Sequence, residues 1–450
     1  MNRPFPASLQ EALQGRGVRL VECCLADYSS VARGKVVDAG DFLAQGGCRM
    51  SSVVFGLGLT AGNPPGMFGP ILPPSYPDIE LVPDPATVVD VPGRAGRASV
   101  LCEPAGPLQG TRYPKSYDAS ELSPRAALRR VTERLAAAGF RARVAPELEF
   151  FLVERSAASA DVLQAPAPGA GCAREMACEA FSLERAEHFG AYFEELYAAC
   201  RTQNIPASGH GHEAAWSQFE VNFHPGGPLA QADAVFRFKR LAREIAARHG
   251  FLATFAAKPF LDQPGTGMHW HFSLWQEDGS NAFAGAGEAR LRHFLGGLQR
   301  HAAGAMAVFA PYDHSWDRIR LADSSPTNAS WGEDDRAAAF RIPLGRPENR
   351  RVENRLPGAD SSPYLVVALT LGLGLLGIEQ GIEPAASPPA LPGSLAEALE
   401  AMDRDPAIRS ILGEVLVDAY CCYKRGESAA RCALPDPRRH WDLVHLVEQA

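Results

Sequence analysis

Four short segments of this chain alternate between apolar side chains and side chains that carry a charge or a polar group. They are VAPELEFFLV at 144–153, SQFEVNF at 217–223, MHWHFSL at 268–274 and RRVENRL at 350–356. Successive side chains of a β-strand point to opposite faces of the sheet, so this period of two predicts four strands with one polar face each. The polar faces carry Glu147 and Glu149; Gln218, Glu220 and Asn222; His269, His271 and Ser273; and Arg351, Glu353 and Arg355.

The composition of these polar faces favours a binding site over a surface that only meets water. An antiparallel sheet with one solvated face is the simpler interpretation of any single strand. Solvated faces usually mix lysine, threonine, serine and glutamate, however, whereas Glu-x-Glu and His-x-His place like groups side by side. A divalent metal relieves that repulsion, and carboxylates joined by an imidazole suit Mg²⁺ or Mn²⁺ better than zinc.

The length, charge and cysteine pattern exclude several classes of protein. The 450 residues suffice for more than one domain, and 46% apolar with 21% charged residues exclude wholesale disorder. A net charge of −8 argues against nucleic-acid binding. Ten cysteines without a CxxC pair, and an N-terminus without an apolar leader, predict reduced thiols in a cytoplasmic protein. The apolar run 364–378 is shorter than a membrane span and predicts a buried helix, so we expect no membrane partner.

Composition also divides the chain along its length. Residues 19–101 alternate short β-rich runs with Gly and Pro turns, which predicts a small β-domain. The Pro- and Gly-rich stretch 104–124 predicts a linker. The segment 155–178 is rich in small residues and proline and predicts an exposed loop.

Four blocks of the sequence together resemble the glutamine synthetases, a family of ATP-dependent carboxylate–amine ligases. They are PELEFFL (146–152), HEAAWSQFEVNF (212–223), KPF with PGTGMHWHFSL (258–274) and DRAAAFRIP with RRVENRLPGADSSPYL (335–365), in the family's order and spacing. The resemblance implies an α+β fold with a β-grasp-like N-terminal domain at 1–106. It implies a catalytic α/β domain with a curved antiparallel sheet at 107–450. It also implies a homo-oligomer with active sites between subunits, a dodecamer of two hexameric rings.

The resemblance assigns roles to the polar side chains of these blocks. It implies two Mg²⁺ or Mn²⁺ ions in each active site. The ion nearer the substrate carboxylate would be bound by Glu149, Glu213 and Glu220, and the ion among the nucleotide phosphates by Glu147, His269 and Glu353. ATP would be contacted by His271, Ser273, Arg341 and Arg351, and the transferring phosphate by Arg336. Glutamate would be held by Arg318, Arg355 and Gly265.

These residue types suit the chemistry of such a ligase. A carboxylate condenses with an amine only after activation, and phosphorylation by ATP supplies an acyl phosphate with a good leaving group. The carboxylate and the triphosphate are both anionic, so metal ions and arginines must neutralise their repulsion during in-line transfer. Arginine suits both partners because its planar fork binds a carboxylate or phosphate through two hydrogen bonds.

Two acids of the ammonia-using members are missing from this sequence. Those members bind ammonium with an Asp-Gly-Ser loop, where this chain reads VVFGLGLTAGNPPG at 53–66. Ser324 stands where they have a flap glutamate, with Asp323 one place earlier. SPTNASWG (325–332) and DYSSVARGKVV (27–37) resemble the branch that joins glutamate to organic amines, including γ-glutamylpolyamine synthetases. The predicted reaction is therefore ATP-dependent joining of the γ-carboxylate of glutamate to an organic amine through γ-glutamyl phosphate.

The sequence leaves the choice of amine open. Polyamines such as putrescine or spermidine are the first prediction. Small monoamines such as methylamine, isopropylamine or ethanolamine are the second, since Trp216 lies between two predicted metal ligands and favours a short amine. Pro264 and Ser208 also depart from the family, the first beside the glutamate pocket and the second at a nucleotide contact. Two alternatives remain. The chain could be an ordinary ammonia-using glutamine synthetase, which the two missing acids disfavour. It could also be a catalytically silent relative, which the complete set of predicted metal ligands disfavours.

Overall fold

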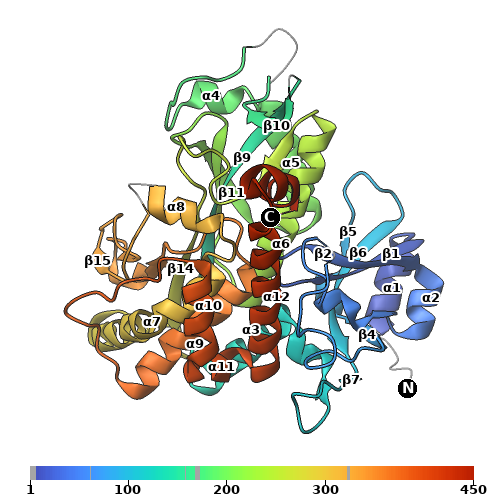
Figure 1. Cartoon of the computed structure of the whole chain (residues 1–450), viewed down its shortest axis with the longest axis horizontal. Helices are drawn as coiled ribbons and strands as arrows, with labels where there is room; N and C mark the ends of the chain where they lie inside the picture. Colours follow the sequence, from blue (N-terminus) through green and yellow to red (C-terminus); the bar gives the residue numbers. More distant parts are fainter. Residues whose placement is uncertain (1–6, 61, 158, 168–172, 322–324, 450) are drawn as a thin grey trace.

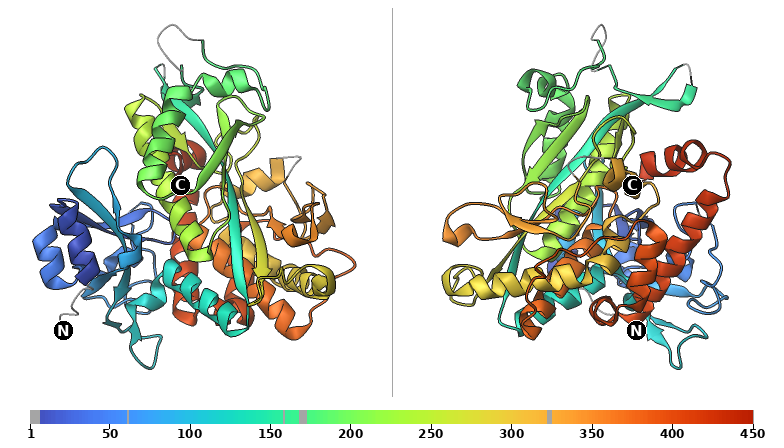
Figure 2. Two further views of the ribbon diagram at one scale, coloured as in Figure 1. Left: turned by 180° about the vertical axis from the view of Figure 1, so that it is seen from behind. Right: turned by 60° about the vertical axis from the view of Figure 1, so that its left-hand side comes forward.

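Two curved sheets dominate the protein (Figures 1 and 2). The computed structural model describes residues 7–60, 62–157, 159–167, 173–321 and 325–449. The smaller sheet is built from N-terminal residues and lies to one side, and the larger sheet runs through the centre of the molecule (Figure 1). This mixture of helices and curved sheets agrees with the predicted fold class, whereas a domain boundary at residues 106 and 107 stays a prediction.

The N-terminal sheet has six strands within the described residues, in the order β2-β1-β6-β4-β3 with β5 paired to β6. They are β1 (Leu20–Ala26), β2 (Ala32–Asp38), β3 (Cys48–Ser51), β4 (Asp78–Pro83), β5 (Val89–Asp90) and β6 (Arg97–Ala105). β1 and β6 run parallel, and the other neighbours run antiparallel. The expected linker that follows contains a small pair of strands, β7 (Pro107–Leu108) and β8 (Tyr117–Asp118), so it is more ordered than its composition predicts.

The larger sheet is centred on β9, which is 16 residues long. Its strands, counted over the described chain, are β9 (Arg141–Ser156), β10 (Ser159–Gln164), β11 (Ala207–His212), β12 (Gln218–Phe223), β13 (Leu252–Thr254), β14 (Met268–Trp275), β15 (Trp331–Glu333), β16 (Phe340–Ile342) and β17 (Val352–Asn354). β12 and β14 flank β9, and the register places Glu220 opposite Glu149 and His269 opposite Glu147. β17 pairs with the other edge of β14. The four predicted strands are therefore neighbours, which confirms that their polar side chains belong to one sheet.

Helices cover the apolar side of this sheet. The helices of the described chain are α1 (Ala7–Gly15), α2 (Ala39–Gln45), α3 (Pro124–Ala137), α4 (Leu183–Glu187), α5 (Gly190–Thr202), α6 (Pro228–Arg248), α7 (Glu288–Phe309), α8 (Ser315–Leu321), α9 (Pro363–Gln380), α10 (Leu395–Arg404), α11 (Pro406–Leu412), α12 (Glu414–Cys432) and α13 (Val447–Gln449), with a π-helix at Arg438–Leu446. α3 and α6 contact β9, and α9 packs against α3, α6 and α7. A side-chain carbon at Gly377 of α9 would lie 2.1 Å from the carbonyl oxygen of His293 in α7, so only glycine permits this helix contact.

Two further sequence predictions, for the apolar run 364–378 and for the segment 155–178, can be compared with the structure. Within the described chain, α9 is the one helix long and apolar enough to cross a membrane, and 78% of that stretch is buried among the other helices, as the prediction of a core helix requires. The predicted loop at 155–178 is wrong at its start, because β9 continues to Ser156 and β10 folds back on it. Leu163 lies opposite Arg155 in that pairing, so contacts with β9 impose a strand on a sequence poor in strand formers.

Candidate active site

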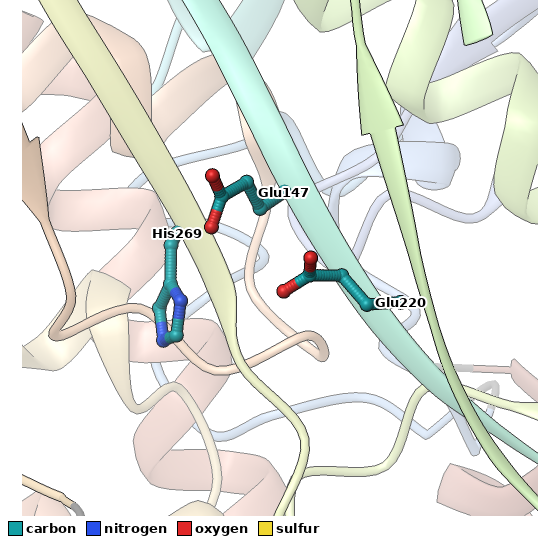
Figure 3. Close-up of side chains that lie close together, drawn as sticks. All are labelled: Glu147, Glu220 and His269. Atoms are coloured by element: carbon teal, nitrogen blue, oxygen red, sulfur yellow. The ribbon is translucent and has the colours of Figure 1, made fainter. Parts of the chain in front are cut away.

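Three strands of the larger sheet direct acidic and histidine side chains into one space. Glu147 comes from β9, Glu220 from β12 and His269 from β14, and Figure 3 shows their side chains pointing towards one another. One ligand atom from each of the three lies within 4.8 Å of those of the other two. Carboxylate oxygens with one imidazole are donors that Mg²⁺ and Mn²⁺ accept, so the arrangement fits such an ion.

A second group of potential metal ligands adjoins the first and shares Glu147 with it. Glu147, His271 and Glu353 also offer ligand atoms within 4.8 Å of one another. His271 Nε2 lies 2.8 Å from Glu147 Oε1, and Arg351 Nε donates to His271 Nδ1 at 3.2 Å. Both ring nitrogens of His271 are therefore engaged, and the ring faces the acidic cluster from the side of the predicted nucleotide contacts.

Glu353 is the most deeply buried acid of the site, with a fully buried side chain. Arg341 Nη1 lies 2.9 Å from one of its oxygens and Arg355 Nη1 2.6 Å from the other. His269 Nδ1 lies 3.8 Å from the Glu353 carboxylate and 4.0 Å from that of Glu149. Two guanidinium groups thus compensate the buried charge, and they fix the carboxylate beside His269.

The remaining acids repel one another at half-buried positions. Burial, together with the charges of Glu147, Glu149 and Glu213, raises the pKa of Glu220 to about 8. Burial and the charge of Glu213 likewise raise the pKa of Glu149, although Glu149 Oε2 accepts a hydrogen bond from the Gly267 N–H at 2.8 Å. Burial also raises the pKa of Glu213. Bringing a cation among these groups would favour their ionised forms, as metal binding requires.

His269 is neutral in this environment. Burial lowers its pKa well below the ordinary value, and the charges of Arg355 and Arg318 lower it further. A neutral imidazole keeps a free lone pair for a metal ion. The potential donors are five carboxylates and two histidines: Glu147, Glu149, Glu213, Glu220, Glu353, His269 and His271. The resemblance assigns the first six of these residues to metal ions and His271 to the nucleotide, and both roles stay predictions. The division of these six residues between two separate ions also stays a prediction.

The predicted glutamate-binding residues lie together next to this cluster. Arg318 is buried, and its guanidinium donates to the carbonyl oxygens of Leu356 at 2.9 Å and Arg355 at 3.2 Å. A side-chain carbon at Gly265 would lie 2.8 Å from Arg318 Cγ and 2.7 Å from the Ala257 carbonyl oxygen, so the site admits no larger residue there. The structure brings these residues into one place, while their contacts with glutamate stay a prediction.

A cavity of about 420 Å³ opens beside His271. The cavity is lined by three of the predicted nucleotide contacts, His271, Ser273 and Arg351. The fourth, Arg341, forms an ion pair with Glu353. The sequence interpretation missed Arg143, whose guanidinium lies 4.5 Å from the ring centre of Trp275, another lining residue that it missed. The signal was present, because Arg143 continues the period-two face of Glu147 on β9, and Trp275 that of Ser273 on β14. The other lining residues are Ala145, Glu147, Pro225, Phe272, Asn281, Glu348 and Asn349.

The rim of the site carries the remaining predicted residues. Arg336 is exposed. Burial alone would raise the pKa of Glu147, but the hydrogen bond from His271 and the charges of His271, Arg355 and Arg336 together lower it. Trp216 lies in the same turn as Glu213 and packs against Phe260, with ring centres 4.3 Å apart. Asp323 and Ser324, on which the amine prediction partly depends, lie outside the described residues.

Comparison with known proteins decides the family. Residues 121–439 match the model of the glutamine synthetase catalytic domain. The chain belongs to the glutamine synthetase family. It is accordingly an ATP-dependent carboxylate–amine ligase, of a family that works with ATP and divalent metal ions.

Relatives within the family differ in the amine that their names give. The chain is 30% identical to gamma-glutamylputrescine synthetase PuuA of Escherichia coli, over 90% of this chain and 88% of that protein. It is 32% identical to a glutamate–isopropylamine ligase of a Pseudomonas species, over 85% and 83%. It is also 32% identical to a glutamine synthetase of Thermus thermophilus, over 91% and 92%.

Solved structures confirm the fold along almost the whole chain. The structure of apo GmaS without ligand superimposes with a TM-score of 0.78 at 26% identity, covering 96% of this chain and 98% of GmaS. The crystal structure of a novel glutamine synthase homologue gives 0.79 at 26% identity, over 99% of this chain and all of that one. The predicted glutamine synthetase-type catalytic fold is therefore confirmed.

Proposed function

We propose that this ligase joins the γ-carboxylate of glutamate to an organic amine through γ-glutamyl phosphate, with a polyamine such as putrescine or spermidine as the first candidate. The acidic and histidine cluster of Glu147, Glu220 and His269, next to the cavity that His271 lines, carries the proposal of phosphate transfer. The absence of an acid at 53–66 carries the preference for an organic amine over ammonium. The two relatives whose names include putrescine and isopropylamine support it.

In this proposal two Mg²⁺ or Mn²⁺ ions would neutralise the phosphates and the substrate carboxylate. Glu149, Glu213 and Glu220 would hold one ion, and Glu147, His269 and Glu353 would hold the other. The short distances among Glu147, Glu220 and His269 and the raised pKa of Glu220 support the presence of a cation in this cluster, because crowded, largely buried acids need a cation between them.

The arginines bind and orient the two anionic substrates. Arg318 and Arg355 take the glutamate, with Gly265 leaving room for it, and His271, Ser273, Arg341 and Arg351 contact the nucleotide. Arg336, exposed at the rim yet close enough to act on Glu147, meets the charge on the phosphate that is transferred. The glutamate oxygen attacks the terminal phosphorus of ATP, ADP leaves, and the amine then displaces phosphate from the acyl carbon.

The apolar surface of Trp216 and Phe260 keeps a small monoamine as the second candidate. Their ring centres lie 4.3 Å apart, and Trp216 lies in the same turn as Glu213. An alkyl group gains about 0.8 kcal/mol for each methylene that it buries. Isopropylamine or methylamine would gain from such a surface, whereas a polyamine also needs a partner for its second charge. We further propose that the enzyme works in the cytoplasm as a dodecamer of two hexameric rings.

An amine panel tests this function. Phosphate release is measured with ATP, glutamate and Mg²⁺ and, in turn, putrescine, spermidine, ethanolamine, isopropylamine, methylamine and ammonium, each corrected for its fraction of free base. We expect kcat/KM for an organic amine to exceed that for ammonium by about 10- to 100-fold, from two or three buried methylenes. Ammonium as the best substrate would make the chain an ordinary glutamine synthetase, and no turnover with any amine would make it a silent relative.

A further inference from the structure

The turn between β11 and β12 carries one proposed metal ligand and is held in a strained conformation. Glu213 and Trp216 lie in it, and the Glu213 N–H donates to the carbonyl oxygen of Gln218 at 2.8 Å. Ser217 has a φ of 53°, in the left-handed region that residues other than glycine avoid at a cost of about 1–2 kcal/mol. Its side chain is fully buried. Contacts from outside the turn must therefore stabilise this shape.

Glu175 supplies those contacts from a segment 42 residues earlier in the chain. Its side chain is 1% exposed, and Oε2 accepts a hydrogen bond from the Ser217 N–H at 2.6 Å. The same oxygen lies 3.1 Å from Nε2 of His212, whose Nδ1 lies 2.8 Å from the carbonyl oxygen of Glu213. One buried carboxylate thus binds the strained residue directly and reaches the backbone of the metal ligand through His212.

The segment that carries Glu175 touches the site at two further points. The Phe181 N–H donates to the carbonyl oxygen of His212 at 2.9 Å. Cys178 Sγ lies 3.4 Å from Gln263 Oε1, two residues before Gly265. Residues 175–181 therefore lie along the edge of the site and bind both the ligand turn and the loop of the glutamate pocket.

We propose that Glu175 is a positioning residue that holds the 213–218 turn so that the Glu213 carboxylate stays directed at the metal ions. This inference rests on the proposed function, since it takes Glu213 as a metal ligand. Loss of the carboxylate leaves a buried N–H without a partner at Ser217 and frees the turn to relax from its left-handed conformation. Groups that orient a metal ligand from behind typically change metal affinity by about 10- to 100-fold when they are removed.

The test compares Mn²⁺ binding to wild type, Glu175→Ala, Glu175→Gln and Glu175→Asp, measured by electron paramagnetic resonance without nucleotide. Glu175→Ala should weaken one Mn²⁺ site by about 10- to 100-fold. Glu175→Gln keeps an oxygen for the Ser217 N–H and should bind within about threefold of wild type, whereas Glu175→Asp keeps the charge but not the reach and should lose affinity. Glu179→Ala is the matched control, because Glu179 lies in the same segment and pairs with Arg185 at the surface.

Steady-state kinetics and the Glu213→Ala variant distinguish a failure of the positioning role of Glu175 from a failure of the assignment of Glu213 as a metal ligand. A positioning role should raise the KM for glutamate while the KM for ATP changes less than about twofold. If Glu213→Ala loses one Mn²⁺ site and a folded Glu175→Ala binds as wild type does, the positioning role is refuted. If Glu175→Ala does not fold, equal Mn²⁺ binding by the Gln and Asp variants refutes it. Unchanged Mn²⁺ binding by Glu213→Ala would instead overturn the ligand assignment on which the proposed function depends.

Discussion

Metal binding to this enzyme should depend steeply on pH, and Glu220 is the main reason. Its pKa is raised to about 8 by burial and by three neighbouring acids, so near neutral pH it carries a proton that a metal ion must displace. A folded-state pKa above the ordinary carboxyl value means that the proton competes with the metal from acid pH up to about pH 8. The apparent affinity should therefore rise with pH and level off above that value.

The size of the effect follows from this pKa. At pH 7 a group with a pKa of about 8 is about nine-tenths protonated, so ionisation of Glu220 on metal binding should by itself release about one proton for each chain. Between pH 6 and pH 8 the unprotonated fraction rises about 50-fold, and the apparent affinity for Mn²⁺ should rise by the same factor. Glu149, whose pKa is also raised, adds to this slope.

The assay is a Mn²⁺ titration of the nucleotide-free enzyme from pH 6 to 8 by electron paramagnetic resonance, with proton release measured by calorimetry in two buffers of different ionisation enthalpy. Glu220→Gln should bind more weakly and lose most of the pH dependence, because the amide does not titrate. Glu383→Gln is the control, since Glu383 is exposed and pairs with Arg292. Equal affinity at pH 6 and pH 8 in the wild type, or an unchanged slope in Glu220→Gln, would refute the reasoning.

Three further changes test the roles of buried groups. Arg318→Ala should raise the KM for glutamate about 10- to 150-fold and that for ATP far less, since a charge-assisted bond contributes about 1.5–3 kcal/mol; equal rises in steady-state kinetics would place Arg318 on the nucleotide. Gly377→Ala should lower the free energy of unfolding by about 1–3 kcal/mol in a urea titration, because the new carbon would lie 2.1 Å from a carbonyl oxygen, and a neutral result would show that α7 and α9 separate easily. Arg431→Met should lower the free energy of unfolding by about 3–5 kcal/mol at neutral pH, because it removes the guanidinium that lies 2.7 Å from the buried carboxylate of Asp442. Burial alone would raise the pKa of Asp442, but Arg431 and His314 hold it below the usual 3.8. The ion pair of Arg431 and Asp442 therefore stabilises the protein above that pH and loses its effect in acid. Acid unfolding monitored by circular dichroism should begin at higher pH in the variant, and an unchanged unfolding profile would count against a stabilising role of the pair.

Much of the candidate site was accessible to prediction because many of its residues lie on strands. Alternation along a strand is a local property, so the sequence indicated that Glu147 and Glu149 share a face, and that His269 and His271 do. The same alternation extends to Arg143 and Trp275, which were missed because the interpretation stopped at the apolar end of each segment. The segment at 155–178 failed for a different reason, since composition describes what a stretch prefers alone and not what a neighbouring strand imposes on it.

By itself, the sequence determined which side chains meet on each polar face and which family the chain resembles. It did not determine that β9 lies between β12 and β14, that two arginines hold the buried carboxylate of Glu353, or that a guanidinium stands over Trp275. Nor did it indicate that Glu175 reaches across to Ser217. Periodicity reports on a few consecutive residues, whereas strand order and long-range hydrogen bonds depend on how the whole chain minimises its exposed apolar surface and unpaired polar groups. The tertiary structure therefore decided how the predicted side chains are placed and what holds them in place.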